Sequence, residues 1–219
     1  MKSWLAMRKL KKPAAMIFLA VYALVARPDG LESLENFVKT AKTGRTDFTQ
    51  VVTAPPKDGQ PPRVKTSTGT FEFSRPSQFK FVYKKPFEQT IVADGQTLWL
   101  YDVDLNQVTS RKQSQVLNAT PAALIATASD LKALQADFSL ANAPDKDGQQ
   151  WVVATPKTKE GQVQDVRIGF KSGQLSSLEI LDSFGQNSRM SFSAFQVNPA
   201  LDAATFQFKP PTGADLVRQ

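Results

Sequence analysis

The chain has 219 residues, of which 41% are hydrophobic, so it can bury a sizeable core in a single domain. It contains no cysteine, which excludes disulfides, thiolate metal sites, thiol catalysis and a lipid-modified N-terminal cysteine. It also contains no histidine, which excludes imidazole metal or haem sites and a histidine-based catalytic triad.

The first 26 residues have the pattern of a secretory signal peptide. A basic leader precedes an apolar run over residues 14–26, which is shorter than the ~20 residues that a membrane-spanning helix needs. We expect cleavage after Ala26, which leaves residues 27–219 as one mature domain. A cut after Ala23 and an uncleaved anchor are the alternatives.

Removal of this leader changes the charge of the chain. The formal net charge is +7, but the leader holds five of the 27 basic residues and no acidic one, so the mature chain carries 22 − 20 = +2. A nearly neutral chain without a Lys/Arg-rich stripe is not expected to bind nucleic acid.

An amphipathic helix is the first predicted element of the mature chain. Apolar residues recur there at helical spacing, namely Leu31, Leu34, Phe37, Val38 and Ala41. We expect this helix to end at Gly44. It is either a core-packing helix or a lid over a sheet.

Residues 45–53 then read as a strand, and a loop rich in proline and glycine, residues 54–63, should hold no regular structure.

The stretch over residues 68–102 has the densest aromatic pattern in the chain. Phe71 and Phe73 share one face of a predicted strand. After a turn at Arg75-Pro76, Phe79, Phe81 and Tyr83 share one face of the next strand. The strand over residues 97–101 is apolar on both faces, which indicates a sheet covered on both sides or one enclosing something apolar.

Two short helical segments are predicted in the middle of the chain, after a polar, strand-like segment over residues 107–114. Thr120-Pro121 should open an apolar helix, with Thr as N-cap, and residues 130–135 form the second segment. Isolated helices shorter than about 12–15 residues are marginal in water, so both depend on docking and are candidates for a movable cover.

The remaining elements are short strands. We expect strands over residues 137–141, 151–155, 164–170, 174–181, 186–195 and 206–208, with a turn over residues 142–148. This spacing predicts a mainly β fold, a meandering antiparallel barrel or half-barrel with few helices.

Catalytic motifs are lacking. There is no glycine-rich phosphate loop, and Asp102 and Asp104 after the strand over residues 97–101 are better explained as a solvated turn than as a carboxylate pair or a calcium site. We therefore expect neither an enzyme nor a cofactor or metal ion.

Several motifs in register along the mature chain resemble the periplasmic outer-membrane lipoprotein carrier family, LolA. They are GTFEFSRPSQFKF over residues 69–81, PFEQTIVADGQTLWLYD over residues 86–102, FTQ over residues 48–50, TPAALIA over residues 120–126 and FQFKPPTG over residues 206–213.

The resemblance implies an unclosed antiparallel β-barrel covered by short helices, with a hydrophobic cavity between barrel and lid. The implied function is to bind the acyl chains of lipoproteins in the periplasm. The partners would be an ATP-driven lipoprotein-releasing complex of the inner membrane and a lipoprotein receptor in the outer membrane, and the carrier would act as a monomer.

The resemblance also implies roles for individual residues. Arg75 would latch the lid by hydrogen bonds to backbone carbonyls around Leu124, Ile125 and Ala126, whereas without the resemblance it would be a surface arginine before a turn. The residues expected to line the lipid cavity are Leu34, Val38, Phe71, Phe73, Phe79, Phe81, Trp99 and Leu124. For each ring, packing in a filled core is the alternative.

A second class of function fits the same fold. A lipid-sensing or lipid-binding regulatory domain on a similar half-barrel would use the same cavity for signalling. A secreted lipid hydrolase is excluded by the missing histidine and the missing Gly-x-Ser-x-Gly motif.

Overall fold

The computed structural model describes residues 28–57, 59–116, 128–158 and 163–219. The expected signal peptide therefore lies outside the described residues. The expected helix that opens at Thr120-Pro121 lies almost wholly outside them. The helices are α1 (Gly30–Thr40), α2 (Gln113–Val116), α4 (Leu131–Asp137) and the 3-10 helix η2 (Ala203–Phe206). The strands are β1 (Thr43–Ala54), β2 (Arg63–Ser74), β3 (Gln78–Lys85), β4 (Gln89–Ala93), β5 (Thr97–Asp102), β6 (Gln107–Lys112), β7 (Phe138–Lys146), β8 (Gln149–Pro156), β9 (Val163–Lys171), β10 (Gln174–Asp182), β11 (Asn187–Val197) and β12 (Asp215–Arg218).

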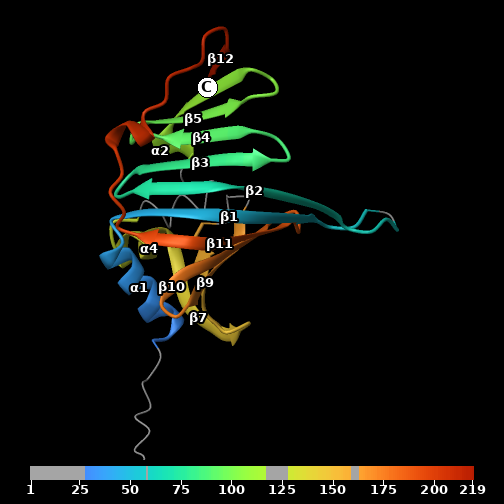
Figure 1. Ribbon diagram of the computed structural model, residues 1–219. Coiled ribbons are helices and arrows are strands. Elements are labelled where there is room, and N and C mark those ends of the chain that lie inside the picture. Colours follow the sequence, from blue (N-terminus) through green and yellow to red (C-terminus); the bar gives the residue numbers. More distant parts are fainter. Residues whose placement is uncertain (1–27, 58, 117–127, 159–162) are drawn as a thin grey trace, which may run out of the picture.

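All twelve strands form one sheet in the order β12-β6-β5-β4-β3-β2-β1-β11-β10-β9-β8-β7. The two edges, β12 and β7, are not paired with each other, so the sheet is unclosed and the predicted half-barrel is confirmed (Figure 1). Every pair is antiparallel except β12 with β6, which run parallel. None of the helices in the described part of the chain is long and apolar enough to cross a membrane.

Helix α1 covers the inner face of the sheet beside β7 to β10 (Figure 1). A capping box opens it, in which the Asp29 carboxylate accepts from Glu32 N and the Glu32 carboxylate accepts from Asp29 N. The helix ends at Thr40, so the prediction that it runs to Gly44 was wrong. Gly44 already lies in β1, where an added Cβ would stand 2.2 Å from the Phe73 ring, so this glycine serves close packing and not a helix stop.

Two asparagines hold α1 at its two ends. Asn142 of β7 accepts from Leu31 N at 2.8 Å and donates to the Asp29 carboxylate at 2.9 Å. Asn198, just after β11, donates to Thr40 O and accepts from Lys42 N at 2.7 Å. The helix is therefore fixed to the sheet at its first and last turns.

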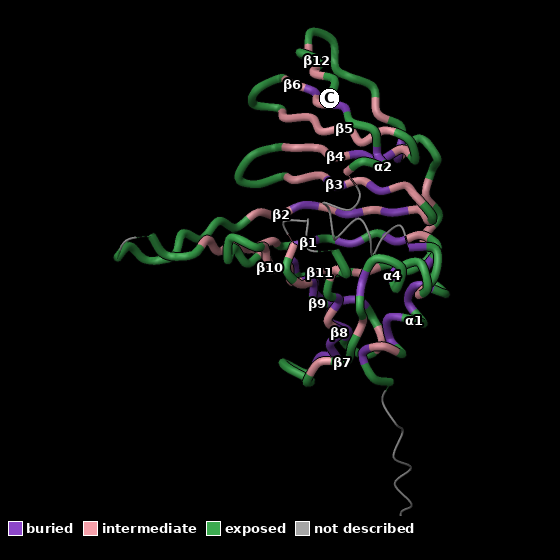
Figure 2. The backbone as a smooth tube through the Cα atoms, turned by 180° about the vertical axis from the view of Figure 1, so that it is seen from behind, coloured by how far each residue is buried: buried purple, intermediate pink, exposed green. Residues whose placement is uncertain are grey.

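Strands β1 and β2 extend as a two-stranded arm beyond the rest of the sheet (Figure 1). The loop between them holds no regular structure among its described residues, as predicted, but Ala54 and Arg63, the ends of the predicted loop, pair in β1 and β2. The turns between β3 and β4 and between β5 and β6 lie at the same end of the sheet as the arm. Figure 2 shows the burial pattern, with buried residues along the middle of the strands and exposed ones along the arm and at these turns.

Two segments differ from their predicted structure. Residues 142–146 continue β7, although Asn142, Pro144 and Asp145 are typical of a turn; the turn comes at Asp147 and Gly148, which both have positive φ. Pro144 is tolerated because β7 is an edge strand. Residues 206–208 are not a strand, because Phe206 ends η2 and the chain leaves it as a connecting segment.

The outer face of the sheet carries its own apolar contacts. Phe208 lies over Trp99 and Tyr101, with ring centroids 5.6 and 6.3 Å apart. Phe208 thus covers the outer face of the sheet at β5.

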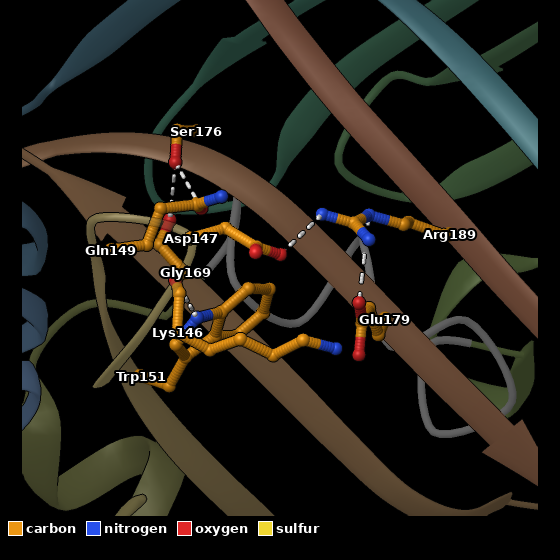
Figure 3. A network of polar contacts seen from close by, with 8 residues as sticks. All are labelled: Lys146, Asp147, Gln149, Trp151, Gly169, Ser176, Glu179 and Arg189. Atoms are coloured by element: carbon orange, nitrogen blue, oxygen red, sulfur yellow. Dashed lines mark hydrogen bonds and ion pairs between the residues drawn. The ribbon is translucent and has the colours of Figure 1, made fainter. Parts of the chain in front are cut away.

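A second contact group lies on the outer face of β8 to β11, where Figure 3 shows a polar network. Trp151 packs against Gly169, and Ser176 donates to Gln149 Oε1 at 2.5 Å. Arg189 pairs with Glu179 at 3.5 Å. These contacts join neighbouring strands and stiffen the half of the sheet on which α1 rests.

Candidate functional site

The inner face of the sheet carries a cluster of aromatic rings. Phe71 and Phe81 face each other across β2 and β3 and stack with their centroids 4.2 Å apart. Phe79 lies edge-to-face with Phe81 at 6.0 Å, and Phe48 of β1 lies edge-to-face with Phe81 at 5.8 Å. The alternation of rings in the sequence places them on one face because successive side chains of a strand point to opposite sides.

Helix α1 adds the other wall of this cluster. Phe37 makes edge-to-face contacts with Phe73, Phe170 and Phe195 at centroid distances of 5.9–6.2 Å. Leu34 and Val38, on the same side of the helix, are fully buried. Such edge-to-face pairs each add about 0.5–1.5 kcal/mol to the free energy of area burial.

The structure brings together most of the residues expected to line a lipid cavity. Six of them are at most 3% exposed and belong to one cluster, namely Leu34, Val38, Phe71, Phe73, Phe79 and Phe81. Trp99 is not with them: Leu98 pairs with Ala93 on the inner face, so Trp99 points to the outer face, beneath Phe208. Leu124 lies outside the described residues. Lipid binding by the cluster stays a prediction.

Arg75 stands at the edge of the cluster, in the turn between β2 and β3. Its Nε donates to Ala41 O at 2.7 Å, and its Nη1 donates to Ala128 O at 2.5 Å. Its guanidinium carbon lies 5.4 Å from the centroid of the Phe37 ring and 5.2 Å from that of Phe73. One side chain thus joins the sheet, the end of α1 and the segment that leads into α4.

Burial shapes the electrostatics of this side chain. Desolvation lowers the pKa of Arg75 to about 10, so the guanidinium remains charged at neutral pH. A charged donor makes stronger hydrogen bonds to carbonyls than a neutral one, and the faces of Phe37 and Phe73 offer further attraction to the cation. A neutral residue of the same length could not replace these interactions.

The expected lid partners of Arg75 lie outside the described residues. Arg75 does bind backbone carbonyls of the covering segments, but the described ones are those of Ala41 and Ala128. Leu124, Ile125 and Ala126 are not described. The role of Arg75 as a latch on a moving lid remains a prediction.

Sequence reasoning missed three polar residues that fix the ends of α1 and the turns at Ser77 and Gly95. Asn142 and Asn198 fix α1, and Gln113 is 2% exposed, donates to Ser77 O at 2.7 Å and accepts from Gly95 N at 3.0 Å. Their bonds reach across 18 to 158 positions in the chain, so no local pattern marks them.

Asp102 ends β5, and Asp104 lies in the turn that follows it. Asp102 accepts from Leu105 N at 3.0 Å, as in an ordinary turn. No group of three or more Asp or Glu side chains that could hold a metal ion occurs in residues 28–57, 59–116, 128–158 and 163–219.

The fold and the site define a class of protein: an open half-barrel with an aromatic inner face and covering segments joined to the sheet by one arginine. Comparison with known proteins makes this more specific. The family model of the outer membrane lipoprotein carrier protein LolA matches residues 39–209. A curated relative from Albidiferax ferrireducens, named outer-membrane lipoprotein carrier protein, is 71% identical over 94% of this chain and 98% of its own length.

A relative of the same name from Methylibium petroleiphilum is 50% identical over 92% of this chain and 95% of its own length. Among solved structures, a LolA superfamily protein from Nitrosomonas europaea has a TM-score of 0.47 and 13% identity over 80% of this chain and 94% of that chain, a likeness too distant to support an inference. The chain belongs to the outer membrane lipoprotein carrier protein LolA family. This is a family of carriers, and its names do not favour the lipid-sensing alternative.

Proposed function

We propose that this protein is a periplasmic carrier that binds the acyl chains of lipoproteins released from the inner membrane and delivers them to the outer-membrane lipoprotein receptor. The observation that carries the proposal is the 71% identity, over nearly the whole chain, to a protein named as such a carrier. The aromatic inner face supports it, because acyl chains need an apolar surface. Leu34, Val38, Phe71, Phe73, Phe79 and Phe81 would contact them.

The energetics make such a carrier necessary. Each buried CH₂ group contributes about 0.8 kcal/mol, so a single acyl chain of about 16 carbons crosses water only at a cost of more than roughly 10 kcal/mol. The six inner residues pack against one another. Entry of a lipid therefore requires the covering segment, residues 128–137, to move and the rings to separate. The structure would then correspond to the closed carrier, with Arg75 holding it closed.

The order of events follows from this arrangement. Residues 1–26 would direct export and be removed, and residues 27–219 would act as a monomer. An ATP-driven complex in the inner membrane would supply the lipoprotein and the work needed to open the carrier. Binding must remain weak enough for the receptor to take the cargo, and an apolar interior without covalent capture meets that need.

Purification of the protein from the periplasm tests the proposal directly. Mass spectrometry of the material that co-purifies should identify acylated lipoproteins in a stoichiometric complex. Recovery of free phospholipid alone would contradict the carrier function and support a lipid-sensing domain. A transfer assay adds a second measure, in which the protein releases labelled lipoprotein from inner-membrane vesicles when ATP is present.

A further inference from the structure

The inner face changes from apolar to polar side chains towards the arm along five neighbouring strands. Towards the arm, each strand passes from an apolar side chain to a polar one on the same face, which alternation and cross-strand pairing establish. Tyr83 of β3, Gln89 of β4 and Asp102 of β5 pair in one row. Gln50 of β1 and Ser67 of β2 pair with each other one step nearer the tip of the arm.

These side chains line a groove of about 460 Å³ at the arm end of the sheet. The groove continues the aromatic interior, because Tyr83 lines it and also lies edge-to-face with Phe48 at a centroid distance of 5.0 Å. Its outer rim holds Phe87, which is 59% exposed, and the ammonium of Lys65, 5.1 Å from the centroid of the Phe87 ring.

We propose that this groove holds the uncharged polar junction of the cargo, the ester and amide groups of the acylated cysteine, with the acyl chains inside the half-barrel and the polypeptide leaving past Phe87. This inference rests on the proposed carrier function and adds to it a site and a direction for the ligand. The Arg75 end of the inner face would receive the chain ends, and the arm end would hold the junction.

The chemistry of the groove fits ester and amide carbonyls. The hydroxyls of Ser67 and Tyr83 and the side-chain amides of Gln50 and Gln89 are donors without charge, and carbonyl oxygens accept such hydrogen bonds. Burial raises the pKa of Tyr83 to about 12, so its hydroxyl remains a donor at physiological pH.

The charges of the groove disfavour a phosphate headgroup. Asp102 and Asp104 line it together with Lys65 as the single described cation, which leaves a net negative charge where an anionic phospholipid would place its phosphate. A second groove, of about 590 Å³, lies at β5, β6 and β12 and is lined by Arg111, Lys112 and Arg218, so it serves as a contrast. The junction groove should thus select acylated cysteine over anionic phospholipid.

One pair of substitutions tests the site. Ser67→Trp fills the junction groove, and Ser114→Trp makes the same change in the second groove as a matched control. The ligands are a palmitoylated S-glycerylcysteine lipopeptide and the neutral apolar dye N-phenyl-1-naphthylamine, both measured by fluorescence. Ser67→Trp should weaken the lipopeptide at least about tenfold, ~1.4 kcal/mol, and leave dye binding within about twofold. Ser114→Trp should change neither.

The outcomes separate this inference from the function on which it rests. If the wild-type protein fails to bind the lipopeptide, the carrier function itself is wrong. If it binds and Ser67→Trp binds equally well, or loses dye and lipopeptide in parallel, the junction lies elsewhere and the inference is overturned. If Ser67→Trp does not fold, Gln89→Leu provides the same test, because it removes donors at nearly constant volume. It should weaken lipopeptide binding and leave dye binding unchanged.

The selectivity has its own measurement. The double variant Asp102→Asn, Asp104→Asn keeps the oxygen that accepts from Leu105 N but removes both negative charges. Uptake of phosphatidylglycerol from vesicles should rise several-fold. Unchanged phosphatidylglycerol uptake would refute the role of these two carboxylates.

Discussion

Replacement of Arg75 by leucine should release the covering segment, residues 128–137, while leaving the sheet intact. The variant loses two described hydrogen bonds from a charged donor, to Ala41 O and Ala128 O, each worth ~1.5–3 kcal/mol. Part of this loss is offset because the variant no longer buries a guanidinium. The lowered pKa of about 10 corresponds to roughly 2 kcal/mol of lost hydration after allowance for partial exposure. The net loss is therefore ~1–4 kcal/mol, roughly a fivefold to several-hundredfold increase in opening.

The opening should be confined to one side of the arginine. Helix α1 keeps the bonds of Asn142 and Asn198 and its ring contacts, whereas the chain at Ala128 loses its described tie to the sheet. Hydrogen–deuterium exchange of peptides covering residues 128–137 and 30–40 measures the two regions separately. We expect faster exchange in the first region and unchanged exchange in the second.

Arg45→Leu is the matched control. Arg45 pairs with Glu72 at 2.7 Å, but its side chain is 47% exposed, so the loss should be within ~1 kcal/mol and should not alter exchange at residues 128–137. If Arg75→Leu exchanged like the wild-type protein over residues 128–137, the arginine would not hold this segment. Unchanged lipoprotein transfer by the folded variant would count against its role as a latch.

Three further outcomes are expected from the packing and the pKa values. Phe37→Ala should lower the free energy of unfolding by ~3–5 kcal/mol in urea titrations because three ring contacts and a buried volume are lost, whereas Phe184→Ala, at a residue 71% exposed, should change it by no more than ~0.5 kcal/mol. Gly69→Ala should cost more than ~2 kcal/mol by the same measurement, since the new Cβ would lie 2.0 Å from Val82 O; wild-type stability would show that β2 and β3 can separate there. The folded-state pKa of Tyr83 is raised to about 12, so its contribution to stability is complete below pH ~10 and is lost as the pH rises through about 12; Tyr83→Phe should flatten the fall in unfolding free energy over that range, and an identical pH profile would contradict it.

The sequence predicts the inner face well because its signal is local. Phe71, Phe73, Phe79 and Phe81 alternate within two adjacent strands, and alternation in a strand fixes the face directly. Arg75 is also well predicted as a residue at the rim, because the turn between two such strands must lie at the end of the sheet.

The failures have a different physical origin. Trp99 has the same alternation as its inward neighbours, but a strand with apolar residues on both faces gives no sign of which side is inside. The contact that shows which face Trp99 occupies is made by Phe208, which lies about 110 positions later in the chain and covers the outer face. Partners so distant in sequence, like those of Asn198, are selected by tertiary packing and leave no periodic trace.

The parallel pairing of β12 with β6 has a consequence for the behaviour of the protein in a crowded compartment. An unclosed sheet has two edges whose free backbone groups can recruit further strands and start polymerisation. Residues 215–218 occupy one edge, and Pro144 and Lys146 interrupt the other with a missing N–H group and a charge. Both edges of the open sheet thus carry features that limit edge-to-edge pairing between copies of a protein.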